Sequence, residues 1–384
     1  MDTLPVTTEN PEAEQWRLLS QFAYYPNIRR HLENSGFGTV EDETVQFVAG
    51  SIRQSQAFFQ AAEDSPLDIS PLLLYYGATN LLIGAYTLKT NDRPDIKHHG
   101  MIITDHVADR IADVRMLPRY REHGGLQQFA NVFSNGCDLA NGHAWTMGEI
   151  LGAIPDLRRD FERHYQDLPY HAVPVEVIRT RQRCMERISN DDLTRYPGPE
   201  EALSQIPGLS QAYLVPQYKP DWVVLHPKLQ GVEIGTYSSS NRKYLQIGHN
   251  KGGGMVVPNQ LILLYMGLFV LGFLPRYLPA LWNPFVQSDT TGEKLIVEKF
   301  LAICQRYMPN LVLNSIFGRR IQFLNETEGI LDLTTRFTED ELKQIVKETV
   351  RELREQGEIA SFTREGLKRL IVETIQQIQT QGEM

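Results

Sequence analysis

Residues 71–88 read PLLLYYGATNLLIGAYTL and are apolar on nearly every side of the helix that they predict. Pro71 suits the first turn of such a helix, because an N–H at that position has no partner within the helix. A helix that is apolar all round is buried among other elements. We therefore expect residues 71–88 to lie at the centre of an N-terminal helical domain that spans residues 1–168.

Apolar residues with helical spacing continue on both sides of this centre. They predict helices at 11–30, 44–62, 104–116, 147–153, 156–165, 197–206, 259–274, 292–306 and 311–317. Short segments rich in β-branched and aromatic residues predict a small antiparallel β region between 169 and 258. The expected fold class is α+β and predominantly helical. It comprises the helical domain, a β-rich insert at 169–258, buried helices at 259–336 that complete the core, and a helical hairpin at 337–384.

Composition excludes several classes of protein. The chain has 384 residues, of which 42% are hydrophobic and 22% are charged, as is typical of a globular protein. A formal net charge of −9 excludes a strongly basic nucleic-acid coat, although it leaves room for a local basic groove. The three cysteines are far apart, which excludes a disulfide framework and a cysteine-built zinc site.

Two features bear on the location of the protein. The first ten residues are polar and acidic, so we expect no secretory signal and a cytoplasmic protein. The most apolar run is LILLYMGLFVLGFL at 261–274, which is too short for a bilayer span of about 20 residues. We expect this run to form a buried core helix.

Several further motifs lie outside the central helix. The tetrapeptide KHHG follows it at 97–100, and later segments read MGEILGAIPDL at 147–157, LPRYLP at 274–279 and PNLVL at 309–313. Together with the helix, these motifs resemble the YaaC-like protein family over about residues 45–320. The resemblance implies a mostly helical protein, but it does not imply a particular reaction.

The tyrosine-bearing helix and its histidine loop also resemble the HEPN superfamily of helical bundles. Many proteins of that superfamily are metal-independent ribonucleases of toxin and phage-defence systems, with an Arg-x(4–6)-His active site paired across a homodimer. The resemblance implies a HEPN-like bundle in the N-terminal domain, RNA as a substrate, a role in bacterial defence or stress, and a homodimer.

Two segments of the chain match this arginine–histidine pattern. The first pairs Arg93 with His98 or His99 in the loop 90–100, and the second pairs Arg159 with His164 on a predicted helix. A histidine can exchange a proton with the ribose 2′-hydroxyl, and an arginine can stabilise the charge that develops on the phosphate. Because such spacings also arise by chance, the motif alone is weak support.

Each candidate residue also has a structural interpretation. A histidine of the loop can clasp a backbone carbonyl, and Arg159 with His164 can belong to a solvated helix face. Asn80 is a polar residue in an apolar helix, so it needs a hydrogen-bond partner. It either clamps two helices together or orients His98 or His99, which would add it to the catalytic candidates.

Basic residues predict where phosphate or nucleic acid would bind. The candidates are Lys97, Arg242, Lys243, His249, Lys251 and Arg276. Four of them lie in or beside the glycine-rich loop 248–254, whose amides can hold an anion and whose neighbouring tyrosines can stack on bases. A flexible turn is the alternative, because the loop matches neither GxxxxGK[ST] nor GxGxxG. Arg276 can instead complement the negative end of its helix.

The function therefore has two interpretations. In the first, the protein acts on RNA without a metal or cofactor, with His98 or His99 as general acid or base, Arg93 at the phosphate and Asn80 as the orienting residue. In the second, the same bundle is a non-catalytic interaction or scaffold module that dimerises or binds a protein partner of a defence system. The histidines near 98–106 match no ligand spacing of a known metal site, so we expect no metal.

Overall fold

The computed structural model describes residues 3–105, 107–119, 123–134, 139, 142–179, 184–194, 196–228, 231, 234–251, 254–256 and 258–324. At residues 179, 249–251 and 254–256 it describes the backbone alone. The chain divides into two compact units, the first of which comprises residues 15–318. In the described part of the second, β1 (Thr3–Thr7) pairs in parallel with β13 (Arg320–Leu324). The predicted hairpin at 337–384 lies outside the described residues, and the predicted domain boundaries stay predictions.

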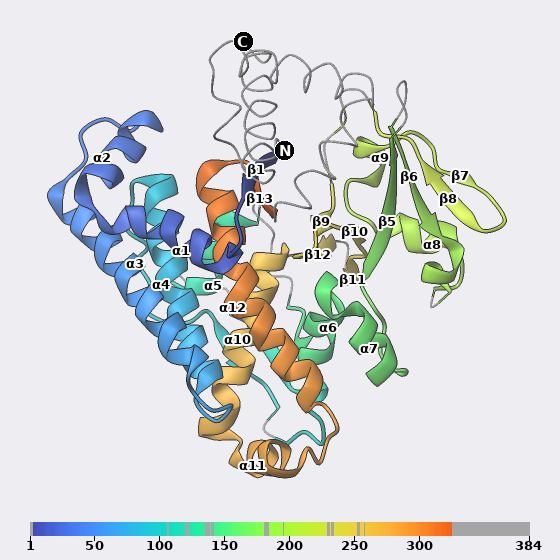
Figure 1. Ribbon diagram of the computed structural model, residues 1–384. Coiled ribbons are helices and arrows are strands. Elements are labelled where there is room, and N and C mark those ends of the chain that lie inside the picture. Colours follow the sequence, from blue (N-terminus) through green and yellow to red (C-terminus); the bar gives the residue numbers. More distant parts are fainter. Residues whose placement is uncertain are drawn as a thin grey trace, which may run out of the picture. The chain divides into compact units, whose positions relative to one another are not determined.

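Long helices form the core of the first unit. They are α3 (Asp42–Glu63), α4 (Ser70–Thr90), α10 (Gln260–Tyr277) and α12 (Lys294–Phe317). Helix α3 runs alongside α4, and both α10 and α12 pack against α4 (Figure 1). Helix α4 also contacts α2 and α5, and most of its residues are buried, so the prediction of a central helix is confirmed; one stripe of the helix, which includes Tyr76 and Ile83, is partly exposed. The helix ends at Asn91, whose left-handed backbone (φ 56°) is a conformation that asparagine tolerates.

Two glycines of α4 allow α3 to approach closely. A Cβ atom at Gly77 would lie 2.7 Å from the ring of Phe59, and a Cβ atom at Gly84 would lie 3.0 Å from Ile52. Carbon atoms that are not bonded pack at about 3.5–4.0 Å. The missing side chains of these glycines therefore set the spacing between the two helices.

Gly267 of α10 gives a stability prediction with a matched control. A Cβ atom there would lie 2.3 Å from Cζ of the buried Phe300 on α12. Gly267→Ala is expected to lower the free energy of unfolding by about 1–3 kcal/mol, because the core must shift to admit the methyl group. Gly50→Ala on α3, where no heavy atom lies within 4 Å, is expected to raise it by about 0.5–1 kcal/mol. Denaturation in guanidinium chloride measures both, and an equal response would contradict the packing of α10 on α12.

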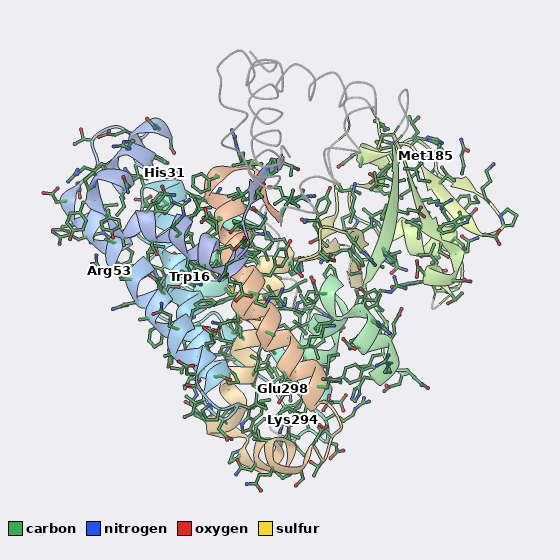
Figure 2. The ribbon with its side chains drawn as sticks, in the orientation of Figure 1. Trp16, His31, Arg53, Met185, Lys294 and Glu298 are labelled. Atoms are coloured by element: carbon green, nitrogen blue, oxygen red, sulfur yellow. The ribbon has the colours of Figure 1, made fainter. Side chains whose placement is uncertain are left out.

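Shorter helical segments complete the helical part. They are α1 (Pro11–Ser20), η1 (Gln21–Ala23), α2 (Tyr25–Asn34), η2 (Ile111–Asp113), α5 (Gly125–Phe133), α6 (Met147–Gly152), η3 (Pro155–Leu157), α7 (Arg158–His164) and α11 (Pro279–Ser288). Trp16 of α1 packs edge-on against Phe59, with ring centroids 5.2 Å apart, and Arg53 of α3 donates to the carbonyl of Ala23 at 3.2 Å (Figure 2). These contacts hold the first helices against α3.

The β region is an antiparallel sheet with the strand order β7-β8-β6-β5-β10-β9. The bounds are β5 (Ala172–Arg179), β6 (Cys184–Ser189), β7 (Gln217–Tyr218), β8 (Trp222–Leu225), β9 (Thr236–Tyr237) and β10 (Lys243–Gln246), with η4 (Asn190–Leu193), α8 (Pro199–Ser204) and α9 (Leu209–Ala212) between strands. Met185 marks β6 in Figure 2. The sheet has a hydrophobic cluster of its own, which includes Val173, Ile188 and Leu225. The predicted α+β, predominantly helical fold is confirmed.

A buried ion pair fixes part of this sheet. The Lys243 ammonium donates to Glu186 at 2.8 Å and to the Tyr213 hydroxyl at 3.1 Å, and Tyr213 donates to the second oxygen of Glu186 at 2.6 Å. Both charged side chains are almost fully buried. Removal of either charged partner would leave the other buried and unpaired, so the pair favours the arrangement that places β10 and β6 on either side of β5.

Several sequence-based predictions of helices need correction: the helix expected at 11–30 is divided into α1, η1 and α2, and α5 was not predicted. The helix expected at 104–116 is wrong, because β3 (Arg115–Pro118) begins there and pairs with β2 (Met101–Ile103) and β4 (Trp145–Thr146). Burial alternates along β3, which is the period of a strand. The helices expected at 292–306 and 311–317 are one helix, α12, which continues through Pro309. The residues on both sides of this proline are buried. Helix α11 was not predicted.

The apolar run predicted to be a core helix lies in α10. This helix has the length and apolarity of a membrane span, yet most of its residues are buried inside the protein. The tyrosine side chain at position 265 lies within it and faces α4, with its ring stacked on that of Tyr75. The core assignment is therefore confirmed, and α10 supplies polar groups to the site described next.

Candidate functional site

The loop after α4 is fixed in place by backbone hydrogen bonds to the start of α5. The N–H groups of Gly125 and Leu126 donate to the carbonyls of His98 and His99 at 2.9 and 3.0 Å. These donors belong to the first turn of a helix, where they have no partner within the helix itself. Gly100 continues the loop with φ +76°, and a Cβ atom there would lie 3.1 Å from the Leu126 nitrogen. The loop therefore holds both histidines in a defined backbone conformation.

His99 is joined to the buried core through one ring nitrogen. Its Nδ1 lies 2.7 Å from the hydroxyl oxygen of Tyr75 on α4, which in turn lies 3.2 Å from the hydroxyl oxygen of Tyr265 on α10. Both tyrosine rings are almost fully buried, whereas the His99 side chain is exposed. Because Nδ1 faces Tyr75, Nε2 on the opposite side of the ring is the nitrogen available to a substrate.

A positive charge lies beside this imidazole. Partial burial, the Arg276 guanidinium and the neighbouring His98 all lower the pKa of His99 below its ordinary value of 6.5. Arg276 is exposed in the last turn of α10, where its Nε donates to the carbonyl of Gly272 at 3.1 Å. This position complements the negative end of the helix, which is one of the two roles that the sequence predicts for Arg276. The bond leaves the terminal nitrogens of the guanidinium for a ligand.

A chain of aromatic ring contacts links the buried Tyr75 to two exposed tyrosines, Tyr76 and Tyr277. The ring centroids of Tyr75 and Tyr76 are 5.9 Å apart, and the ring of Tyr76 is partly exposed. On the other side, Tyr75 contacts Phe269, Phe269 contacts Phe273 and Phe273 contacts Tyr277, with centroid distances of 5.8, 6.5 and 4.5 Å. Tyr277 is 58% exposed and lies under the Arg276 guanidinium, 5.0 Å from its carbon.

The tyrosine chain determines what the imidazole can do. Burial and then the neighbouring Tyr265 raise the pKa of Tyr75 well above 10, so its hydroxyl stays protonated at neutral pH. When Nδ1–H of His99 donates to Tyr75 and Tyr75 donates to Tyr265, Nε2 carries a free lone pair. A neutral histidine in this tautomer is a general base, and its orientation is set by the hydrogen bond at the other nitrogen.

The residues of the first predicted pair, Arg93 with His98 or His99, have different partners in the structure. The Arg93 guanidinium forms an ion pair with Glu43 at 3.0 Å and lies over the ring of Phe47, with 5.6 Å from its carbon to the ring centroid. Both partners belong to α3. His98 accepts a hydrogen bond from the Gly100 N–H at Nδ1, at 3.1 Å. The structure therefore brings His99 next to Arg276 and ties Arg93 to α3.

Two other candidates of this region have local partners. The Asn80 amide donates to the carbonyl of Tyr76 at 2.9 Å, one turn earlier in its own helix. This bond neither clamps two helices nor orients a histidine. Lys97 is exposed and lies 3.6 Å from the Asp95 carboxylate, while its backbone N–H donates to the His123 carbonyl. Lys97 stays available as a surface cation of the loop.

The second predicted pair and the basic loop lie elsewhere in the first unit. Arg159 and Arg242 line one pocket, between α7 and the sheet. His164, at the end of α7, packs its ring edge-on against Tyr165. Lys243 was predicted to bind phosphate, but its ammonium group is buried against the Glu186 carboxylate and is not available to a phosphate. His249–Lys251 form β11, which pairs with β12 (Gly254–Val256), and their side chains lie outside the described residues.

Across the part of the chain that the structure describes, no group of three or more His, Cys, Asp or Glu side chains is placed to hold a metal ion. Asp105 instead lies 3.5 Å from the Arg115 guanidinium. The His99 site offers imidazole, guanidinium and phenol groups, which are proton-transfer and anion-binding groups.

The electrostatic link between Arg276 and His99 gives a measurable prediction. Arg276→Gln removes a positive charge, so protonation of His99 becomes easier and its pKa is expected to rise toward 6.5. Titration of the His99 ring resonances by NMR measures this shift. Arg93→Gln removes an equal charge from α3 and is expected to leave the His99 pKa unchanged. A larger shift with Arg93→Gln would show that Arg93 is the partner after all.

Comparison with known proteins identifies one family. A model of the YaaC-like protein family matches residues 24–316 of the chain. No curated protein and no solved structure matches it. The matched range contains Tyr75, His99, Tyr265 and Arg276, so the whole candidate site lies within the family's domain.

Proposed function

The chain belongs to the YaaC-like protein family, and we propose that it is a metal-independent ribonuclease whose general base is His99. Arg276 stabilises the phosphate in the transition state, and Tyr75 is a positioning residue that holds the imidazole. The observation that carries the proposal is the exposed His99 ring, fixed at Nδ1 by a buried hydroxyl and placed beside an exposed guanidinium.

The groups present are sufficient for cleavage of RNA by its own 2′-hydroxyl. Nε2 of His99 accepts the proton of the 2′-hydroxyl, whose oxygen attacks the adjacent phosphorus, and the bond from phosphorus to the 5′-oxygen breaks. The imidazolium returns the proton to the departing 5′-oxygen. The products are a 2′,3′-cyclic phosphate and a 5′-hydroxyl, and Arg276 offsets the extra negative charge of the intermediate.

The aromatic surface supports a single-stranded substrate. Tyr76 and Tyr277 are exposed at the two ends of the chain of ring contacts that includes Tyr75, the partner of His99, and Arg276 lies over the Tyr277 ring. Bases of an unpaired strand stack on such rings at about 1–3 kcal/mol each, while arginine attracts the backbone. This combination compensates locally for the net charge of −9 of the whole chain.

The wider context of the proposal rests on the HEPN resemblance. A HEPN-like bundle implies a homodimer with two sites near its axis, action on RNA in bacterial defence or stress, and a cytoplasmic location. The alternative function is a non-catalytic module that binds RNA or a protein partner through the same aromatic surface.

Incubation with RNA in EDTA tests the proposed reaction. Single-stranded RNA is expected to yield fragments with 2′,3′-cyclic phosphate ends, whereas DNA of the same sequence is expected to stay intact because it lacks the attacking hydroxyl. Cleavage of the DNA as well would contradict the mechanism. Binding of RNA without cleavage would favour the non-catalytic module.

A further inference from the structure

A second site lies away from His99, where α7 meets the β sheet. A pocket of about 340 Å³ is lined by Pro155, Asp156, Arg158, Arg159, Glu162, Pro174, Ser238, Ser240, Arg242 and Tyr244. Its walls come from η3 and α7 on one side, and from β5, β10 and the turn that precedes β10 on the other. The lining contains three arginines and two carboxylates, in a chain that has more acidic than basic residues overall.

The two carboxylates of the pocket have their own partners. Asp156 accepts hydrogen bonds from the Ser239 N–H, at 3.0 and 3.1 Å, and from the Ser239 hydroxyl. Glu162 accepts from Nε of Arg158 at 3.1 Å, and Arg158 also pairs with Asp192 outside the pocket. The acidic groups are therefore engaged by the turn and by one arginine.

The other two arginines are left without such partners. Arg159 and Arg242 are exposed, and neither guanidinium group forms an ion pair or hydrogen bond with any residue that the structure describes. Arg159 belongs to α7 and Arg242 immediately precedes β10, so the pocket lining brings together two arginines from different elements. Each guanidinium presents a planar set of N–H donors that matches the oxygens of a phosphate.

Hydroxyl groups complete the lining. Ser238 and Ser240 share a hydrogen bond of 2.9 Å between their oxygens, and the Ser238 oxygen also accepts the Arg242 N–H at 3.2 Å. With Ser240 as acceptor in that pair, its own hydrogen points away from Ser238 and is free to bind a ligand. The Tyr244 hydroxyl has no hydrogen bond within the described part of the chain, and burial raises its pKa, so it remains a donor.

We infer that this pocket binds the phosphate monoester of a small polar molecule, with its phosphate between Arg159 and Arg242. The hydroxyls of Ser240 and Tyr244 donate to the ester. The volume exceeds that of a phosphate ion and lies at the lower end of the range for small-molecule sites, which leaves room for an attached sugar. The site is separate from His99 and does not depend on the proposed ribonuclease activity.

Isothermal titration calorimetry of the full chain tests this assignment. The probes are inorganic phosphate, ribose 5-phosphate and unphosphorylated ribose. Ribose 5-phosphate is expected to bind with a submillimolar Kd, more tightly than phosphate, and ribose is expected not to bind. The double variant Arg159→Gln/Arg242→Gln is expected to weaken ribose 5-phosphate at least about tenfold, since two charge-assisted contacts are lost.

The control is a double variant with the same change of charge. Arg30 and Arg53 are exposed on α2 and α3, and Arg30→Gln/Arg53→Gln is expected to leave the Kd unchanged. No binding of ribose 5-phosphate to the wild-type protein would overturn the proposal. So would an equal loss in both double variants, because it would show a general effect of charge. Phosphate binding as tightly as the ester would overturn the assignment to an ester.

Discussion

His99→Asn is expected to lower the rate of RNA cleavage by about 10²- to 10⁴-fold, which is the usual contribution of a general base. Asparagine is chosen because its side-chain amide N–H can still donate to the Tyr75 hydroxyl, as Nδ1–H of His99 does, so the buried chain of tyrosines keeps a partner. It cannot take up a proton near neutral pH. The loss therefore reports proton transfer and not collapse of the loop, and kcat is measured with a single-stranded RNA in EDTA.

The adjacent histidine provides the matched comparison. His98→Asn makes the same substitution one residue earlier, and the new oxygen can accept the Gly100 N–H that Nδ1 of His98 accepts now. We expect this variant to keep kcat within a few-fold of the wild type. Equal losses in the two variants would mean that the loop as a whole matters and that neither imidazole is the base.

Glu293→Ala is expected to lower the free energy of unfolding by about 3–5 kcal/mol. The Glu293 side chain is fully buried just before α12. Its carboxylate accepts the N–H groups of Ile111 and Ala112 at 2.6 and 2.8 Å and the Tyr165 hydroxyl at 2.6 Å. Without it, three buried donors lose their acceptor at once.

A second glutamate of the same helix serves as the control. Glu298 is exposed one turn into α12 (Figure 2), so Glu298→Ala is expected to change the free energy of unfolding by less than about 0.5 kcal/mol. Guanidinium chloride denaturation followed by circular dichroism measures both variants. A Glu293→Ala protein as stable as the wild type would contradict the role of this carboxylate in joining η2, α7 and α12.

The helices that sequence predicts well are those whose burial follows from their own residues. The 71–88 run is apolar on all sides, so its central position depends on no distant contact. The 104–116 segment failed because η2 is fixed by Glu293, which is far away in the sequence. The helical spacing of its apolar residues was misleading, because a distant carboxylate and the pairing of β3 with β2 decide the structure of this segment.

The candidate site was predicted only in part. The loop histidines and Arg276 were each singled out from sequence, but the pairing of His99 with Arg276 was not. Spacing along the chain favoured Arg93, whereas the packing of α10 on α4 brings in a residue far along the chain. Neither Tyr75 nor Tyr265 is among the site residues predicted from sequence, because both side chains are typical of buried helices.

The most direct test of the account is the pH dependence of kcat/KM for RNA cleavage, set beside the pKa of His99 measured by NMR on the free protein. A base is active when it is deprotonated, so kcat/KM is expected to rise with pH through one inflection at the pKa of His99, below 6.5. An inflection at any other pH, or a rate that does not change across the titration of His99, would contradict the assignment of this imidazole as the base.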